Sequence, residues 1–202
     1  ALGTNSTSFV GSTGNDTVTT AVTAGTAAGS TDGGIGTDTL VVNAVTDVDT
    51  AAEGAEYTGF EGLTVAGTLD VSHVAGSMTY VNVTGTSTLT NMSAALAGAV
   101  TVTADAGAST FALKTATGTS DVLSLTMGTG KTTSEATDFT GALTVTGFET
   151  LNITTAAGPS ASTANQNTAI ASISGANLTA INLSGQSVTL SNAATTKATV
   201  ID

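Results

Sequence analysis

The chain has 202 residues, with 15 acidic side chains, three lysines and a net charge of −12. A chain this acidic cannot neutralise a run of nucleic-acid phosphates or an anionic membrane surface, which excludes both as partners. It contains no cysteine, and no apolar run reaches the roughly 18 residues that a membrane span needs, so we expect no membrane insertion. What this charge attracts is cations.

The composition predicts an all-β fold. Thr, Ala, Gly, Ser and Val dominate, Pro159 is the only proline, and 24 residues are glycine. This combination favours many short strands that are joined by tight turns. Aromatic residues make up only 3% of the chain, so we expect a thin core of stacked Val, Leu, Ile, Ala and Thr without large buried rings. A parallel β-solenoid or β-roll with Gly, Asn and Asp at its corners has such a core.

Residues 1–42 contain two copies of one Gly-rich pattern, at residues 11–19 and 33–41. The second copy matches the nonapeptide G-G-x-G-x-D-x-U-x at every defined position, with Asp38 as the acid and Leu40 as the apolar residue. Glycines allow such a turn to take positive φ, and the Asp supplies an oxygen for a hard cation such as calcium. The first copy is degraded, because Ser12 stands where the second Gly would be. We therefore predict RTX-like calcium-binding turns over 1–42.

The spacing of the two copies is not that of tandem nine-residue turns. Asp16 and Asp38 are 38 − 16 = 22 residues apart rather than 18, so we expect residues 20–31 to bulge out as a loop. Asp32, just before the second Gly pair, could add an oxygen ligand. The candidate metal ligands and turn residues of this region are Gly14, Asn15, Asp16, Asp32, Gly34, Gly36 and Asp38.

Residues 43–202 are predicted to continue the solenoid. Alternation of apolar residues with Thr predicts nine strands near 62–66, 78–83, 100–103, 110–113, 122–127, 142–146, 150–154, 179–183 and 187–190. One helical turn is expected over Asn91–Gly98 because of its Ser, Ala and Leu content.

Two related units echo each other along the chain, at about 33–110 and 118–202. Gly-Phe-Glu with an x-Leu-x-Val/Ile tail occurs at residues 59–65 and again at 147–153, and a corner that runs from Gly-Thr to an Asp precedes each, at residues 36–38 and 118–121. Asp38 thus pairs with Glu61, and Asp121 with Glu149. Facing carboxylates repel unless they are protonated or bridged by a cation. Either calcium bridges each pair, or each Glu accepts hydrogen bonds from the backbone of its own turn.

The remaining ionisable residues give no second candidate site. Four acids between residues 47 and 56 are interpreted as a solvated loop, and four others as surface acids: Asp70, Asp105, Glu135 and Asp138. His73 is the only histidine, so neither a zinc site nor a Ser-His-Asp relay has the partners it needs. We therefore expect a structural His73, and no enzyme.

The stretches 32–41 and 59–67, followed by 116–126 and 148–153, resemble RTX-type S-layer proteins of Gram-negative bacteria, in particular the calcium-binding, lattice-forming part of the caulobacter type. The resemblance implies a right-handed β-solenoid, type I secretion and calcium-bridged assembly into a two-dimensional lattice at the cell surface. Calcium ligation carries over to Asp16, Asp38 and Asp121. The short, interrupted nonapeptide array departs from the family, and we expect surface-polysaccharide anchoring from parts outside this segment.

The sequence therefore predicts a structural, self-assembling surface-layer segment whose folding depends on calcium. The alternative is a stalk or passenger segment of a large secreted RTX adhesin. An ice-binding solenoid would need Thr-x-Thr in register on every coil, whereas the copies at 101–103 and 144–146 are irregularly placed.

Overall fold

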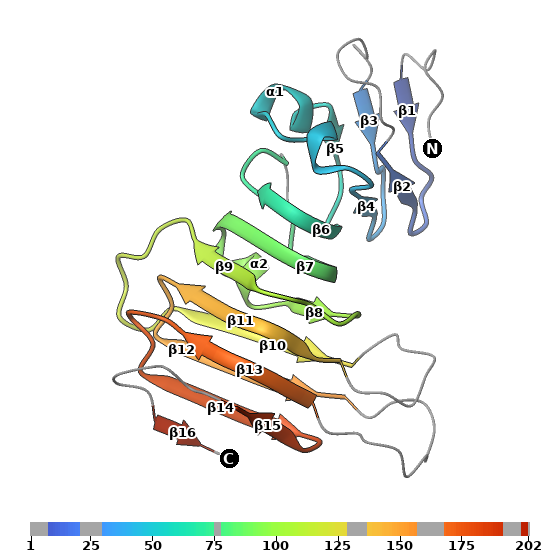
Figure 1. Cartoon of the computed structure of the whole chain (residues 1–202). Helices are drawn as coiled ribbons and strands as arrows, with labels where there is room; N and C mark the ends of the chain where they lie inside the picture. Colours follow the sequence, from blue (N-terminus) through green and yellow to red (C-terminus); the bar gives the residue numbers. More distant parts are fainter. Residues whose placement is uncertain are drawn as a thin grey trace, which may run out of the picture.

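The computed structural model describes residues 8–20, 30–74, 78–128, 137–156, 168–191 and 199–201. These residues are mostly strands, and every strand pairing among them is parallel. Figure 1 shows the strands stacked one above another from the N-terminal to the C-terminal end of the chain. The all-β class and the parallel pairing are thus confirmed.

Most strands form one continuous stack that runs the length of the molecule. It contains β2 (Thr17–Thr19), β4 (Thr39–Val41), β6 (Gly62–Asp70), β7 (Tyr80–Met92), β8 (Val100–Val102), β10 (Val122–Met127), β12 (Thr150–Thr155), β14 (Ala180–Gly185) and β16 (Thr199–Ile201).

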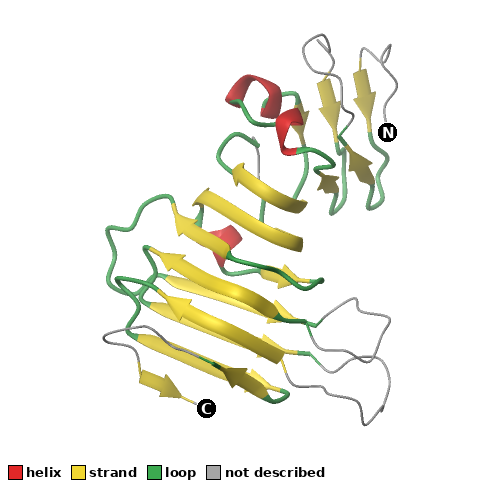
Figure 2. Ribbon diagram, in the orientation of Figure 1, coloured by secondary structure: helices red, strands yellow, loops and turns green. Residues whose placement is uncertain are grey.

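A second stack begins on the far halves of β6 and β7. It continues through β9 (Ser109–Leu113), β11 (Phe139–Thr146), β13 (Thr168–Ser174) and β15 (Val188–Leu190). A separate three-stranded sheet holds β1 (Ser8–Val10), β3 (Ser30–Asp32) and β5 (Tyr57–Thr58). The chain therefore alternates between two stacks, and Figure 2 shows the connecting loops gathered at the strand ends.

The strand register pairs buried aliphatic residues of neighbouring strands with one another. Leu63 pairs with Val81, Val81 with Val100, Val100 with Leu125, and Leu125 with Ile153, and all five are buried. Successive strand residues point to opposite faces, so each such row forms one layer of the core between the two stacks. This arrangement agrees with the predicted core of stacked aliphatic side chains.

The core also contains aromatic rings, which the sequence interpretation did not expect. Phe60, Phe111, Phe139 and Phe148 have no exposed surface. The prediction of a core without large buried rings is therefore wrong. Few aromatic residues are present, but four of the chain's five phenylalanines are placed inside, where a ring removes the most apolar surface from water.

Three short helical segments lie beside the strands: η1 (Val45–Asp47), α1 (Ala51–Gly54) and α2 (Ala94–Ala97). α1 begins with a capping box, in which Thr50 and Glu53 satisfy each other's backbone N–H groups. At the start of α2, Ser93 accepts the N–H of Leu96. α2 confirms the helical turn expected over 91–98. None of the helices in these described ranges is long and apolar enough to cross a membrane.

The predicted strands are found close to their expected positions, and Val122–Met127 has the expected bounds. The short strand expected to begin at Leu40 is β4, whereas the far halves of β6 and β7, the strand β13 and the short strands β1, β2, β3 and β5 were missed. Two to three residues carry too little alternation to reveal a strand. The division into residues 1–42 and 43–202 stays a prediction.

Candidate cation site at the glycine-rich corner

The second nonapeptide copy forms the corner between β3 and β4. Gly34 and Gly36 have φ of 94° and 152°, values that non-glycine residues rarely adopt. Within the same corner, Asp32 Oδ1 accepts the N–H of Gly34 at 3.1 Å. Asp32 therefore stabilises its own turn. The glycine pattern predicts the local backbone correctly, because only glycine takes these angles without strain.

The first copy lies directly on the second despite their spacing of 22 residues. Thr39 N–H donates to Asp16 O at 2.8 Å, and Thr37 N–H donates to Asn15 Oδ1 at 3.0 Å. Ile35 N–H donates to Ser12 O at 3.1 Å. The two turns are therefore stacked, as adjacent β-roll turns would be. The loop expected over 20–31 lies largely outside the described residues, which resume at residue 30.

Close contact between the turns leaves no room for side chains at their glycines. A Cβ at Gly33 would meet the carbonyl oxygen of Gly59, and a Cβ at Gly36 would lie 2.7 Å from that of Gly14 and 3.2 Å from Asp38 Oδ1. These glycines are thus required for the turns to approach one another and for backbone oxygens to lie near the Asp38 carboxylate.

Asp38 is the central residue of this corner. Its side chain is completely buried, at 0% exposure. Oδ1 accepts the N–H of Asp16 at 2.7 Å, whereas Oδ2 is buried without a hydrogen-bond partner. No salt bridge to Asp38 occurs in the described part of the chain, where the one ion pair is His73–Asp70. A buried carboxylate oxygen without a donor or counter-charge is costly, so this oxygen is the strongest candidate in the corner for contact with a cation.

The acids of successive turns are linked through the backbone. Glu61 Oε2 accepts the N–H of Asp38 at 2.9 Å, and Asp38 in turn accepts the N–H of Asp16. The carboxylate of Asp16 bonds back to its own turn, with Oδ2 accepting Ser12 N–H at 2.6 Å. Asp38 and Glu61 therefore each stabilise the preceding turn, whereas Asp16 stabilises its own.

The corner at Asp121 and Glu149 repeats this arrangement. Glu149 Oε2 accepts the N–H of Asp121 at 2.8 Å, and Asp121 O accepts the N–H groups of Glu149 and Thr150. One carboxylate oxygen of Asp121, Oδ2, is again buried without a partner. The two glutamates thus hydrogen-bond to the backbone, as one of the two sequence-based alternatives proposed. The donor, however, lies in the preceding turn and not in the glutamate's own turn.

The Gly-Phe-Glu motif explains why both corners are alike. Gly59 and Gly147 both have positive φ, 69° and 81°, and the phenylalanine that follows each is fully buried. The glycine reverses the chain, the ring anchors the turn in the core, and the carboxylate of the next residue reaches the neighbouring turn.

No protein-family model, curated protein or solved structure matches the chain. Any function must therefore be inferred from the chain's own residues.

A cation at the glycine-rich corner would depend largely on backbone oxygens. Within the described ranges, no group of three or more His, Cys, Asp or Glu side chains is placed to hold a metal ion. In each of the predicted acids Asp16, Asp32 and Glu61, one carboxylate oxygen accepts a hydrogen bond from a backbone N–H group. Calcium accepts carbonyl as well as carboxylate oxygens, so a calcium ion at Asp38 Oδ2 would have to take its other ligands from backbone carbonyl groups.

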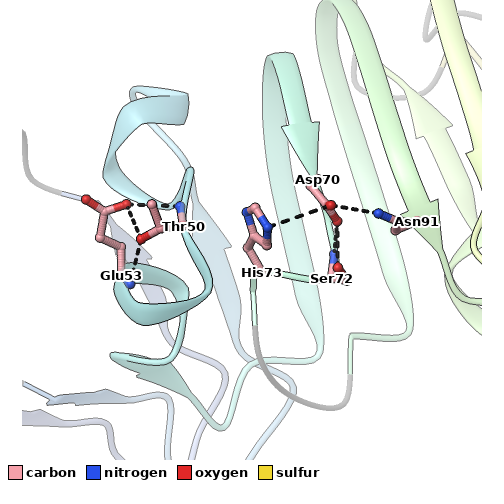
Figure 3. A network of polar contacts seen from close by, with 6 residues as sticks. All are labelled: Thr50, Glu53, Asp70, Ser72, His73 and Asn91. Carbon is pink, nitrogen blue, oxygen red and sulfur yellow. Dashed lines mark hydrogen bonds and ion pairs between the residues drawn. The ribbon is translucent and has the colours of Figure 1, made fainter.

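His73 lies in a separate polar network, drawn in Figure 3. Its Nε2 is 3.7 Å from Asp70 Oδ2, and the same carboxylate accepts hydrogen bonds from Ser72 and from Asn91. Burial raises the pKa of Asp70, but these hydrogen bonds and the nearby imidazole outweigh it and lower the pKa below its usual value. In this network, Asp70 links His73 to Ser72 and to Asn91 of the next strand.

The acids between residues 47 and 56 bind one another and the backbone of the first helical turns. Asp47 Oδ2 accepts the hydroxyl of Thr20 at 2.6 Å. The hydrogen bond with Glu53 raises the pKa of Asp49, and the hydrogen bond from Thr50 lowers that of Glu53. Asp49 is exposed, as expected for a solvated loop.

Two acids that the sequence assigned to the surface also link neighbouring strands. Asp105 Oδ1 accepts the N–H of Asp138 at 3.1 Å, and Asp138 Oδ1 accepts the N–H of Ala169 at 2.7 Å. The position of Asp138 directly before β11 is the sequence signal that could have revealed this role. Glu135 lies outside the described residues.

Proposed function

We propose that this chain is a non-enzymatic, extracellular structural segment in which calcium stabilises the glycine-rich corner of a right-handed β-solenoid and which associates with copies of itself in a surface layer. The observation that carries the proposal is the fully buried Asp38, with Oδ2 unpartnered between stacked glycine turns. A cation there would neutralise the carboxylate and occupy its unused lone pairs.

The stacked parallel strands support the same proposal. Strand β4 pairs with β2 and β6, at offsets of 39 − 17 = 22 and 62 − 39 = 23 residues, so a turn that is stabilised at residues 33–38 also supports the turns on either side. A solenoid propagates stability through such nearest-neighbour contacts. Secretion and surface location follow from the RTX-like pattern of residues 33–41, because millimolar calcium is found outside cells and extracellular calcium modules typically bind at about 10⁻⁴–10⁻³ M.

Calcium titration is the test of this proposal. Isothermal calorimetry and far-UV circular dichroism on the full chain, with magnesium as the control ion, should show calcium-specific binding and a gain of β-signal. Saturation at 100 times the dissociation constant would add about 2.7 kcal/mol per site to the free energy of unfolding.

Asp38→Asn should abolish the strongest calcium response, because the amide cannot supply the unpartnered anionic oxygen. Glu56→Gln is the matched control, since it removes the same charge at a position outside both glycine-rich patterns, directly before β5. Equal calcium responses in the parent, Asp38→Asn and Glu56→Gln would contradict a site at Asp38.

A further inference from the structure

Tyr80 makes a contact across three strands beside the candidate cation site. Its hydroxyl lies 2.7 Å from the Oγ1 of Thr39, the residue that directly follows Asp38. The ring crosses Gly62, because a Cβ at that glycine would meet both the ring and its hydroxyl. Thr39, Gly62 and Tyr80 are register partners in β4, β6 and β7, which follow one another in Figure 1. One side chain therefore links the strands that begin directly after Asp38 and Glu61.

The tyrosine ring explains why residue 62 is a glycine. Gly62 does not have positive φ, so its backbone conformation does not itself require glycine. A glycine inside a strand has no side chain to pack, and an aromatic ring on a neighbouring strand compensates when it covers the exposed backbone. Gly62 is buried in this way, and its N–H donates to Asp38 O at 2.9 Å. The ring of Tyr80 therefore covers a residue that holds the main chain of the aspartate.

The main chain connects the same residues. Asp38 O accepts the N–H groups of Glu61 and Gly62, at 3.1 and 2.9 Å. Glu61 Oε2 accepts Asp38 N–H at 2.9 Å, and Glu61 O accepts the N–H of Tyr80 at 3.3 Å. The backbone thus joins Asp38 to Tyr80 through Glu61, and the phenol hydroxyl returns to Thr39. Together these contacts hold the turn of Asp38 on the turn of Glu61.

The corner at Asp121 has the same backbone hydrogen bonds but lacks the aromatic contact. Asp121 O accepts the N–H groups of Glu149 and Thr150, and Glu149 O accepts the N–H of Ala180 at 3.1 Å. The three residues in register are Val122, Thr150 and Ala180, whose short side chains do not span two strand spacings of about 4.8 Å each. The aspartate of this corner is half-buried, whereas the aspartate beside the tyrosine is completely buried.

We propose that Tyr80 is a positioning residue of the candidate cation site, because its hydroxyl and ring hold the turn that carries Asp38 on the following turn. This inference deepens the proposed function and rests on it. A calcium ion at Asp38 Oδ2 needs backbone oxygens of the stacked turns as further ligands. Chains in which the turn is displaced do not offer them, and the apparent dissociation constant rises with the fraction of such chains. Tyr80 therefore acts on calcium affinity through the turn.

Calorimetry with calcium on the full chain measures this contribution. Tyr80→Phe keeps the ring and removes the hydroxyl, so we expect the dissociation constant for calcium to rise about threefold to tenfold, the effect of one net hydrogen bond. Tyr57→Phe removes the same group from the chain's other tyrosine, in β5, and should leave the constant unchanged. Equal constants for the parent and Tyr80→Phe overturn the inference, as does an equal rise in Tyr57→Phe.

A double-mutant cycle isolates the hydrogen bond between the two hydroxyls. Thr39→Val removes the other partner of the 2.7 Å contact and should raise the dissociation constant by a similar factor. Combined with Tyr80→Phe it should have little further effect, because both substitutions delete the same bond. Effects that multiply would show that the two side chains act independently, which overturns the inference. Thr39→Val also replaces Tyr80→Phe if circular dichroism shows that the latter is unfolded.

Gly62→Ala tests the position of the ring. The added methyl group would displace the ring of Tyr80, so calcium affinity should fall at least as much as in Tyr80→Phe. In a chain that already carries Tyr80→Ala, the same Gly62→Ala substitution should cause no further loss. A loss of equal size in both backgrounds overturns the role of the ring.

Amide hydrogen exchange separates positioning from a general loss of stability, and it needs no calcium. The N–H groups of Asp16, Asp38 and Asp121 each donate to a carboxylate of the next turn. In EDTA, Tyr80→Phe should speed exchange at Asp16 and Asp38 and leave Asp121 unchanged, because only the first two belong to the turns that it holds. Equal acceleration at all three amides would indicate a global effect and overturns the inference.

The two measurements distinguish a failure of this inference from a failure of the proposed function. If the parent binds no calcium while Tyr80→Phe still speeds exchange at Asp38, the calcium site fails and Tyr80 still holds the turn. If the parent binds calcium and Tyr80→Phe changes neither the dissociation constant nor the exchange rate, the inference fails and the calcium site stands.

Discussion

The corner at Asp38 and the corner at Asp121 share one hydrogen-bonding scheme but differ in burial. In both, a glutamate of the next turn accepts the N–H of the aspartate, and one aspartate oxygen is buried without a partner. Asp38 is completely buried between two stacked glycine turns, whereas Asp121 is half-buried beside the exposed residues 118–120. The same pattern of backbone hydrogen bonds therefore leaves the Asp38 side chain fully buried, whereas part of the Asp121 residue is exposed to water.

The largest expected effect is the loss of stability when a buried phenylalanine is removed, and it tests whether the two Gly-Phe-Glu corners stabilise the fold equally. Phe60→Ala and Phe148→Ala should each lower the free energy of unfolding by about 3–5 kcal/mol, because each ring is fully buried. Phe9→Ala is the control, since this ring is only half-buried at the end of the stack, and it should cost less. Urea denaturation measures all three. A loss at Phe148 no greater than that at Phe9 would show that the two corners are not equivalent.

Substitution of each aspartate by Asn compares how strongly Asp38 and Asp121 make the stability of the fold depend on calcium. In EDTA, Asp38→Asn should be at least as stable as the parent, because the amide removes a buried negative charge and keeps an acceptor for Asp16 N–H. Calcium at 100 times the dissociation constant should raise the free energy of unfolding of the parent by about 2.7 kcal/mol and leave that of Asp38→Asn unchanged. Asp121→Asn should change in the same direction by a smaller amount. If the difference in unfolding free energy between the parent and Asp38→Asn is the same with and without calcium, the result contradicts a cation at this corner.

Backbone strain at the two corners is tested by Gly59→Ala and Gly147→Ala. Both glycines have positive φ, and an added Cβ would also meet Asp32 Oδ1 at Gly59 and Ala116 Cβ, 2.8 Å away, at Gly147. Each substitution should lower the free energy of unfolding by about 1–3 kcal/mol. Gly98→Ala is a suitable control, since Gly98 has negative φ and the nearest contact of an added Cβ would be 3.4 Å. Thermal melts in which Gly98→Ala is as damaging as the other two would refute the role of positive φ.

The smallest expected effect concerns pH and the Asp70 network. The pKa of Asp70 is lowered in the folded chain, so its ionised form stabilises the fold above the unfolded pKa, and this contribution is lost as pH falls through the folded pKa. Solvent screening limits it to about 1 kcal/mol or less. Asp70→Asn should therefore reduce the difference in urea midpoint between pH 7 and pH 3, whereas Asp49→Asn, whose pKa is raised, should not. Identical pH profiles for parent and Asp70→Asn would contradict this role.

The sequence by itself determined the all-β class, most strand positions in the second half and the glycine corner at 33–38. These features depend on local properties, namely β-branched alternation and the backbone freedom of Gly34 and Gly36. The repeated Gly-Phe-Glu motif also revealed that Glu61 and Glu149 occupy equivalent corners.

Only the tertiary structure decided which groups meet between turns. The sequence could not show that Glu61 bonds to the N–H of Asp38, that Asp38 Oδ2 is left without a partner, or that the rare phenylalanines fill the core. Each of these facts depends on the register between strands more than 20 residues apart, and a shift of one residue would exchange the buried and exposed faces. The alignment of Thr101, Thr126 and Thr154 in one row has the same origin, because only the pairing of the strands brings these residues side by side.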